Sequence, residues 1–184
     1  YASGAACLIN VEILKKLGPF DSKLFMYHED VDLGWRLWLS GFKNMIEPKS
    51  IVYHKYEFSK SIQKYYFMER NRRIVILQNY KMLTLILIFP ALLFMEIGIT
   101  FFASKGKWAK EFLESWKYFL SYKNWQEILA KRKKIQKNRR VSDRQLLKKF
   151  VGKIEFQDLE NKILKNYANP VFNFYFQAIK LLVW

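Results

Sequence analysis

Short apolar segments separated by turn residues characterise the first third of the chain. Residues 5–11, 43–46 and 50–54 are apolar runs bounded by glycine, proline or serine, which predicts three short strands. Residues 31–40 instead carry apolar side chains at helical spacing after an acidic first turn, and Gly41 follows as a C-terminal cap. A helix that alternates with short strands predicts an α/β fold for this region.

Longer helical patterns fill the remainder of the chain. Residues 62–80 are predicted to form a helix rich in aromatic and basic side chains, and residues 82–103 are apolar apart from Glu96. As one continuous helix the apolar segment would extend about 33 Å, close to the hydrocarbon thickness of a bilayer at about 30 Å. Pro90 interrupts this segment, and a charged Glu96 is costly at the bilayer centre. We therefore expect a helix bent at Pro90 that stays on one side of the membrane, and a helix that crosses it is the alternative.

Two basic segments follow the apolar one. In residues 107–122 aromatic side chains recur at helical spacing among lysines, which predicts an interfacial helix with Trp108 and Trp116 at the membrane surface. Residues 131–149 contain ten basic side chains and a single acidic one. A last apolar helix is predicted to begin at Asn169.

Composition and charge narrow the function classes. The 184 residues are 51% hydrophobic, which excludes a disordered tail, and the single Cys7 excludes a disulfide framework or a four-cysteine zinc site. Residues 1–58 carry equal numbers of basic and acidic side chains, so the whole net charge of +16 lies in residues 59–184. Cationic segments on both sides of an apolar one favour an anionic membrane surface as a partner over nucleic acid.

The acidic cluster Glu29, Asp30 and Asp32 is the strongest candidate for chemistry. Three carboxylates at the start of a helix repel one another, which raises the proton affinity of at least one and suits it to act as a general base. The alternative is purely structural: the acids cap the helix, and Asp32 pairs with Arg36 one turn later.

Several motifs in a fixed order resemble the C-terminal half of a family 2 glycosyltransferase domain, most closely its rhamnosyltransferase-like branch. The motifs are Ser3-Gly4-Ala5-Ala6-Cys7, Leu17-Gly18-Pro19-Phe20-Asp21, Phe25-Met26-Tyr27-His28-Glu29-Asp30-Val31-Asp32, Gly41-Phe42 and Val52-Tyr53-His54. The likeness continues through residues 65–71 and 131–143. It implies a GT-A fold, and it implies that an N-terminal half with the donor site precedes these residues.

The resemblance also implies roles for individual residues. Asp30 matches the base that deprotonates the acceptor hydroxyl, and Glu29 would tune or orient it. Gly4, Asp32 and Arg36 match positions around the substrate, where we interpret Asp32 and Arg36 as the pair that locks the helix carrying Asp30.

A divalent metal, Mn²⁺ or Mg²⁺, is the cofactor that the resemblance implies. His54 matches a histidine that completes the coordination of this metal in some members, and imidazole slightly favours manganese. A structural role for His54 at a strand end stays open. His28 is not included in the predicted site.

The expected organisation has five parts. Residues 1–58 belong to the catalytic domain, 59–81 form a connecting helix, 82–103 a membrane helix, 104–150 basic interfacial helices and 151–184 terminal amphipathic or apolar helices.

The expected activity is inverting transfer of a sugar, for example rhamnose, from a nucleotide-diphosphate donor to a lipid-linked or polysaccharide acceptor at the cytoplasmic face of the cell membrane. A processive polysaccharide synthase is an alternative, but the chain shows one hydrophobic segment of spanning length. Two alternatives without catalysis are a nucleic-acid-binding module that uses residues 131–149, and a basic anchoring or scaffold segment on an inactive transferase domain.

Overall fold

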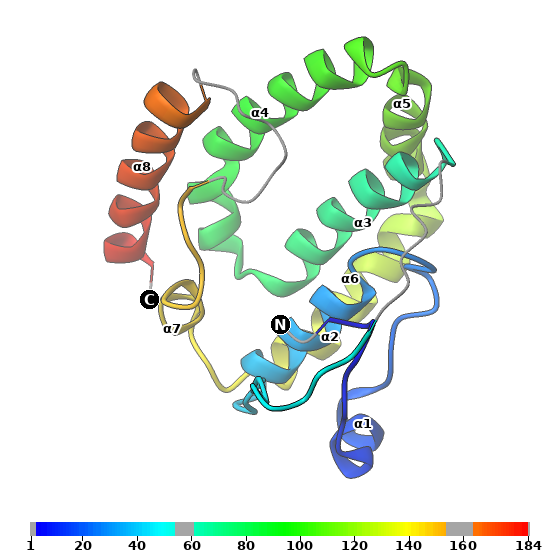
Figure 1. The fold of residues 1–184 in the computed structure, drawn as a ribbon, viewed down its shortest axis with the longest axis vertical. Helices are drawn as coiled ribbons and strands as arrows, with labels where there is room; N and C mark the ends of the chain where they lie inside the picture. Colours follow the sequence, from blue (N-terminus) through cyan, green and yellow to red (C-terminus); the bar gives the residue numbers. More distant parts are fainter. Residues whose placement is uncertain (1–2, 54–60, 154–163, 184) are drawn as a thin grey trace.

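All regular secondary structure in the described part of the chain is helical. The computed structural model describes residues 3–53, 61–153 and 164–183 (Figure 1). In chain order its elements are α1 (Val11–Leu17), α2 (Glu29–Leu39), α3 (Lys64–Asn79), α4 (Met82–Lys105), α5 (Ala109–Lys117), the 3₁₀ turn η1 (Tyr118–Leu120), α6 (Tyr122–Lys137), α7 (Asp143–Leu147), the π-helical turn η2 (Leu164–Ala168) and α8 (Asn169–Leu182).

The predicted α/β fold, a GT-A domain portion, is wrong for the described residues, which contain no strand. Residues 5–10 and 43–46 lack regular structure, and Val11 begins a helix. Leu8 is fully exposed and Ile46 is 88% exposed. A strand is stable only when a neighbouring strand satisfies its backbone N–H and C=O groups. Within the part of the chain that the structure describes, no segment forms a ladder with residues 5–10 or residues 43–46.

Local capping signals set the limits of the first two helices, of which the sequence predicts the one at Gly41. The Asn10 side chain accepts hydrogen bonds from the backbone N–H groups of Glu12 and Ile13, which satisfies two free donors at the start of α1. Gly18 ends α1 with φ +85°, and Gly41 has the same φ just after α2. Glycine adopts this left-handed conformation without a steric penalty.

The main hydrophobic core joins α2 to helices far along the chain. Leu24, Trp35 and Leu39 pack with α3, α6 and α7. Tyr80 contacts the Trp35 ring edge-on at 4.8 Å between centroids. The core therefore draws on three of the five predicted parts, and α2 is held in position by the helices that follow it.

Polar side chains of the basic segment satisfy the end of α3. Arg132 of α6 donates to the carbonyls of Leu77 and Tyr80, and Gln136 donates to those of Gln78 and Asn79, both at 3.0 Å. Cationic groups are favourable at a helix C-terminus because the last carbonyls carry partial negative charge. Part of the basic segment is therefore used inside the fold.

A buried carboxylate satisfies the start of the next helix. Asp143, which is fully buried, accepts hydrogen bonds from the Lys81 backbone N–H at 2.7 Å and the Thr84 hydroxyl at 2.6 Å, and it pairs with Arg139. The same Arg139 donates to the Asn79 carbonyl. The ion pair thus links the end of α3 to the beginning of α4.

Helices α3, α4 and α5 enclose a triangle in Figure 1, and α8 lies beside the first half of α4. The apolar side of α5 packs on α3: Phe112 is buried, and the Arg73 guanidinium lies 4.2 Å from the centre of the Trp116 ring. Trp108 stacks on Tyr65. These contacts engage Trp108 and Phe112 with the protein, whereas Trp116 is 43% exposed, and an interfacial role of α5 stays a prediction.

Candidate functional site

Asp30 lies in the first turn of α2, where two backbone N–H groups meet its carboxylate. Gly4 donates to Oδ2 at 3.0 Å and Val31 donates to Oδ1 at 2.7 Å. A Cβ atom built on Gly4 would lie 3.6 Å from the Asp30 Cβ, an ordinary van der Waals distance. The structure thus brings the two predicted site residues Gly4 and Asp30 together, and crowding within the chain does not itself require glycine at this position. The approach of Gly4 to a sugar acceptor stays a prediction.

The loop that leads to Asp30 has an unusual backbone. Phe25, Tyr27 and His28 have φ values of 61°, 63° and 65°, in the left-handed region that residues other than glycine rarely adopt. Each such residue costs about 1–2 kcal/mol. Strain of this kind persists only when the surroundings hold it in place.

Asn71 of α3 provides this hold. Its side-chain amide, which is fully buried, donates to the carbonyls of Leu24, Met26 and Tyr27, each at 2.8 Å. The neighbouring Arg70 donates to Asn71 Oδ1 at 2.9 Å and to the Lys23 carbonyl at 2.8 Å. We call this arrangement the loop clamp: Arg70 and Asn71 with the carbonyls of residues 23, 24, 26 and 27. It sets the direction in which α2 begins.

Asp32 and Arg36 form a buried ion pair that anchors α2 on its other side. Arg36 Nε donates to Asp32 Oδ2 at 2.8 Å, and the rest of the guanidinium donates to the carbonyls of Leu17, Gly18 and Pro19 at 2.8 to 3.0 Å. Both side chains are almost fully buried. These contacts support the interpretation that the pair locks the helix, while a contact with substrate stays a prediction.

Burial changes the protonation of the two residues before Asp30. Burial and the nearby Arg72 lower the pKa of His28 to about 4, against a smaller opposite effect of Asp30. His28 is therefore neutral at pH 7. Burial, followed by the charge of Asp30, raises the pKa of Glu29, although a hydrogen bond with its own backbone opposes this. Glu29 therefore holds its proton more tightly than an ordinary glutamate does.

Asp30 contributes to the wall of a hollow of about 180 Å³. Leu33, Gly34 and Leu37 of α2 form one side, and the extended segments 7–10 and 42–45 form the others. The volume is below the range of about 300–1,000 Å³ that is usual for drug-sized ligand sites. The described residues therefore enclose room for a small group beside the carboxylate.

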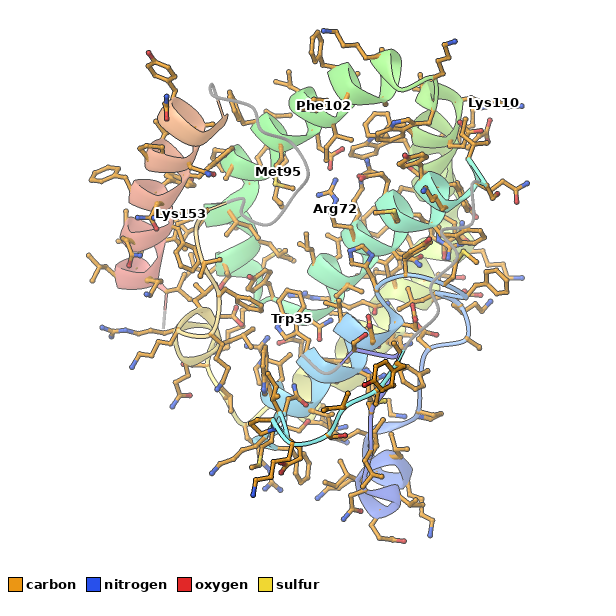
Figure 2. The ribbon with its side chains drawn as sticks, viewed as in Figure 1. Trp35, Arg72, Met95, Phe102, Lys110 and Lys153 are labelled. Atoms are coloured by element: carbon orange, nitrogen blue, oxygen red, sulfur yellow. The ribbon has the colours of Figure 1, made fainter. Side chains whose placement is uncertain are left out.

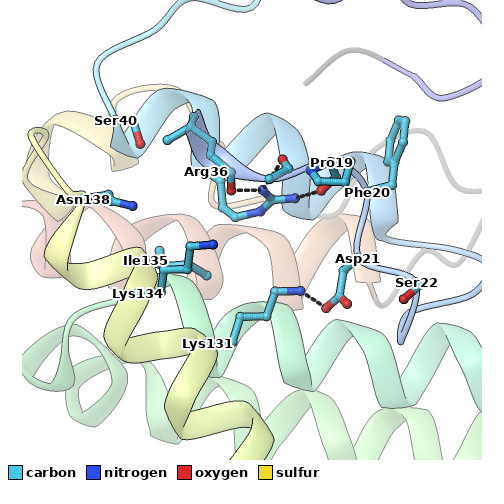
Figure 3. Close-up of a pocket in the computed structure, with 12 residues that line it drawn as sticks. Pro19, Phe20, Asp21, Ser22, Arg36, Ser40, Lys131, Lys134, Ile135 and Asn138 are labelled. Atoms are coloured by element: carbon cyan, nitrogen blue, oxygen red, sulfur yellow. Dashed lines mark hydrogen bonds and ion pairs between the residues drawn. The ribbon is translucent and has the colours of Figure 1, made fainter. Parts of the chain in front are cut away.

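A second hollow of about 190 Å³ lies between the Gly18-Pro19 turn and α6 and does not include Asp30 (Figure 3). Arg36 and Lys131 line it, but Arg36 is occupied by backbone carbonyls and Lys131 pairs with Asp21. Because Arg36 and Lys131 already have partners, we assign no chemistry to this hollow.

The predicted metal site lies partly outside the described residues. His54 is one of the residues that the structure does not describe. Among the residues that it does describe, no group of three or more His, Cys, Asp or Glu side chains is placed to hold a metal ion. The described side chains therefore do not form a metal site, and no step below depends on one.

The loop clamp and His28 are the parts of this site that sequence reasoning missed. The adjacent Arg70 and Asn71 lie in the helix already noted for its resemblance, yet an isolated helix pattern does not show which loop a buried amide will bind. His28, which the sequence does not include in the site, is the N-cap residue of α2, and the charges of Arg72 and Asp30 both act on it.

Comparison with known proteins gives a partial similarity to a glycosyltransferase. Over 54 residues the chain is 39% identical to N-acetylglucosaminyl-diphospho-decaprenol L-rhamnosyltransferase of Mycobacterium tuberculosis, in strains CDC 1551 and H37Rv. The matched stretch is 29% of this chain and 18% of each relative, so the chain spans less than a fifth of the length of these proteins. No family model matches the chain. No solved structure matches it either.

Proposed function

We propose that this chain carries the catalytic base of an inverting glycosyltransferase, with Asp30 as that base. The observation that carries the proposal is the Asp30 carboxylate, held by the Gly4 N–H at 3.0 Å and placed in the wall of a hollow. The partial similarity to a rhamnosyltransferase supports the same reaction class. We extend this proposal to a sugar donor that is activated by a nucleotide diphosphate.

The proposed reaction is a single displacement. The acceptor hydroxyl attacks the anomeric carbon as Asp30 takes its proton, a new C–O bond forms, and the C–O bond to the diphosphate breaks. The diphosphate leaves with the electron pair of that bond. Inversion at the anomeric carbon follows from attack on the face opposite the leaving group.

Glu29 and the loop clamp would support this step without touching the sugar. Burial is the main reason that the pKa of Glu29 is raised. Glu29 therefore takes up a proton at a pH nearer to neutral than an ordinary glutamate does. The clamp fixes the start of α2, so the Asp30 carboxylate needs little reorganisation before the proton transfer. Asn71 acts in this proposal as a positioning residue.

A membrane location for the acceptor is the second element of the proposal. Helix α4 is long and apolar enough to cross a membrane, by length and composition, and only 6% of its most apolar window is buried. A lipid-linked or polysaccharide acceptor would be reached from the cytoplasmic face, where nucleotide-sugar donors are soluble. The nucleic-acid alternative loses support because Arg132 and Arg139 contact helix carbonyls within the fold.

The decisive experiment is Asp30→Asn in the full-length protein that contains this chain. Asparagine keeps one of the two oxygens that accept from the Gly4 and Val31 N–H groups, so the fold is expected to persist, while turnover falls by roughly 10² to 10⁴ because the base is lost. Donor binding, measured by calorimetry, should change little. Glu12→Gln, in an exposed pair with Lys15, is the matched control and should keep full turnover. Near wild-type turnover of Asp30→Asn would remove Asp30 from the mechanism.

A further inference from the structure

Helix α4 exposes one continuous apolar face. The large side chains exposed along it recur every three or four residues, at the spacing of one side of a helix. They are Met82, Ile86, Phe89, Leu93, Ile97 and Phe101, all more than half exposed. At 1.5 Å per residue the 24 residues of the helix extend about 36 Å. An apolar strip of this length is rare on a soluble surface and indicates a partner.

Glu96 lies at the edge of this strip, three residues after Leu93 and seven after Phe89, and it binds α4 to the polar body of the protein. Arg73 of α3 pairs with Glu96 at 2.7 Å, Arg72 pairs with it as well, and Arg72 also pairs with Glu69 at 2.8 Å. Figure 2 shows Arg72 pointing from α3 toward α4. Glu96 lies in the middle third of α4, so the attachment is central and not at an end of the helix.

Helix α8 adds a second apolar element beside α4. The Tyr175 hydroxyl donates to the Leu87 carbonyl at 2.6 Å, and the rings of Phe94 and Phe172 meet edge-on at 5.6 Å between centroids. Beyond these contacts α8 exposes Val171, Phe174, Leu181 and Leu182 at helical spacing. We call the exposed apolar sides of α4 and α8 together the apolar face.

Basic side chains border this face. Lys105, Lys107 and Lys110 are exposed where α4 gives way to α5, and Lys105 also lies over the Phe101 ring at 4.4 Å. Figure 2 shows Lys110 at that corner and Lys153 near α8. Apolar side chains bordered by cations match the two layers of an anionic bilayer surface, its acyl boundary and its headgroups.

We propose that the apolar face of α4 and α8 lies in one leaflet of an anionic lipid bilayer with α4 parallel to the membrane plane. Were α4 to cross the bilayer, Glu96 would sit near its centre and would bring Arg72 and Arg73 with it. Those arginines belong to α3, which also holds the buried polar Asn71 and Gln78 and packs on α2 and α6. An in-plane α4 keeps this charged cluster above the acyl chains. The inference goes beyond the proposed transfer reaction and does not depend on it.

The test measures the depth of three positions along α4 in vesicles. In a Cys7→Ser background, single cysteines replace Ile86, Leu93 and Phe101, each carries an environment-sensitive probe, and lipids with quenchers at known depths report its position. We expect equal, shallow depths at all three positions in vesicles containing phosphatidylserine. A deeper probe at Leu93 than at the two others would establish a span and overturn the proposal.

Vesicle binding with matched variants provides the second measurement. Ile86→Glu and Ile97→Glu, both at positions 63% exposed, should each weaken co-sedimentation of the 184-residue chain with phosphatidylserine vesicles roughly tenfold, since they place a charge among acyl chains. Leu113→Glu on α5, at a position 58% exposed, is the control and should bind as the unmodified chain does.

These measurements also distinguish the alternatives to a lipid-bound apolar face. A stronger loss for Leu113→Glu than for the α4 variants would place α5 at the membrane and overturn the proposal. Absence of vesicle binding, together with a dimer in sedimentation that Ile97→Glu dissociates, would show that a second copy covers the face. The transfer assay of Asp30→Asn is unaffected by either outcome, so the two proposals fail separately.

Discussion

Helices α3 and α4 face opposite kinds of surroundings. In the middle of α3 the loop clamp buries polar groups, because Arg70 and Asn71 bind the carbonyls of the loop before Asp30. After the end of α3 the chain turns into α4, whose long apolar side stays exposed. Polar residues are thus inside and apolar residues outside, the reverse of the usual distribution.

This contrast shows which groups find their partners within the chain and which do not. Buried polar groups are tolerated because hydrogen bonds replace the water they lose, and the clamp supplies those bonds within the chain. Exposed apolar side chains find no such replacement within the described residues. The clamp should therefore respond to single substitutions with lost stability in water, whereas the apolar face should respond only when lipid is present.

The largest effect on stability is expected from Asp32→Asn. The change leaves the buried Arg36 guanidinium without its counter-charge, and losing one partner of a buried ion pair costs about 3–5 kcal/mol. Urea unfolding followed by circular dichroism measures it, with the exposed Glu12→Gln as the control at below about 1 kcal/mol. A loss for Asp32→Asn as small as that of the control would mean that the pair does not anchor α2.

An acid-dependent effect of similar size is expected from His28. Its pKa is lowered to about 4 in the folded chain, mainly by burial, so between pH 6.5 and 4 the unfolded chain binds more protons than the folded one. The resulting loss of stability begins as the pH falls below 6.5 and reaches about 3 kcal/mol below pH 4.

His28→Asn isolates this contribution. Asparagine tolerates the left-handed backbone at this position and does not titrate. Unfolding free energies of the two proteins, measured from pH 4 to pH 7, should converge or cross as the pH falls. Parallel pH curves would show that His28 titrates normally in the folded protein.

A moderate effect is expected from Asn71→Ala. Three carbonyls lose their donor in a strained loop, which costs about 1–3 kcal/mol. In the full-length protein the same change should lower kcat more than it raises KM, because it disturbs the position of Asp30. Asn44→Ala is the control, since the Asn44 amide donates to a single carbonyl, that of Gly34. Equal losses of stability in the two variants, with unchanged kcat, would leave the clamp without a positioning role.

The smallest effect is expected from Ile97→Gln on the apolar face. The side chain is 63% exposed, so its replacement by a helix-compatible polar residue should change the free energy of unfolding in water by less than about 0.5 kcal/mol. Chemical denaturation without lipid or detergent checks this. A loss well above 1 kcal/mol would show that the face is already packed in solution and would break the contrast with the clamp.

Much of the helical structure could be predicted from the sequence. Gly41 follows the end of α2 as expected, and α4 and α8 begin where the apolar pattern does, at Met82 and Asn169. Helices are predictable in this way because their hydrogen bonds join residues four apart, so the signals that start and stop them are local.

The tertiary structure alone decided where polar and apolar groups find their partners. Residues 5–11 and 43–46 have the pattern of strands, but a strand needs another strand beside it, and none is present in the described part of the chain. Arg132, which the sequence counts among cations for a membrane or a nucleic acid, binds the carbonyls at the end of α3. Asn71 reaches a loop more than forty residues away. These partners lie far apart along the chain, and only packing brings them within the 3 Å that a hydrogen bond requires.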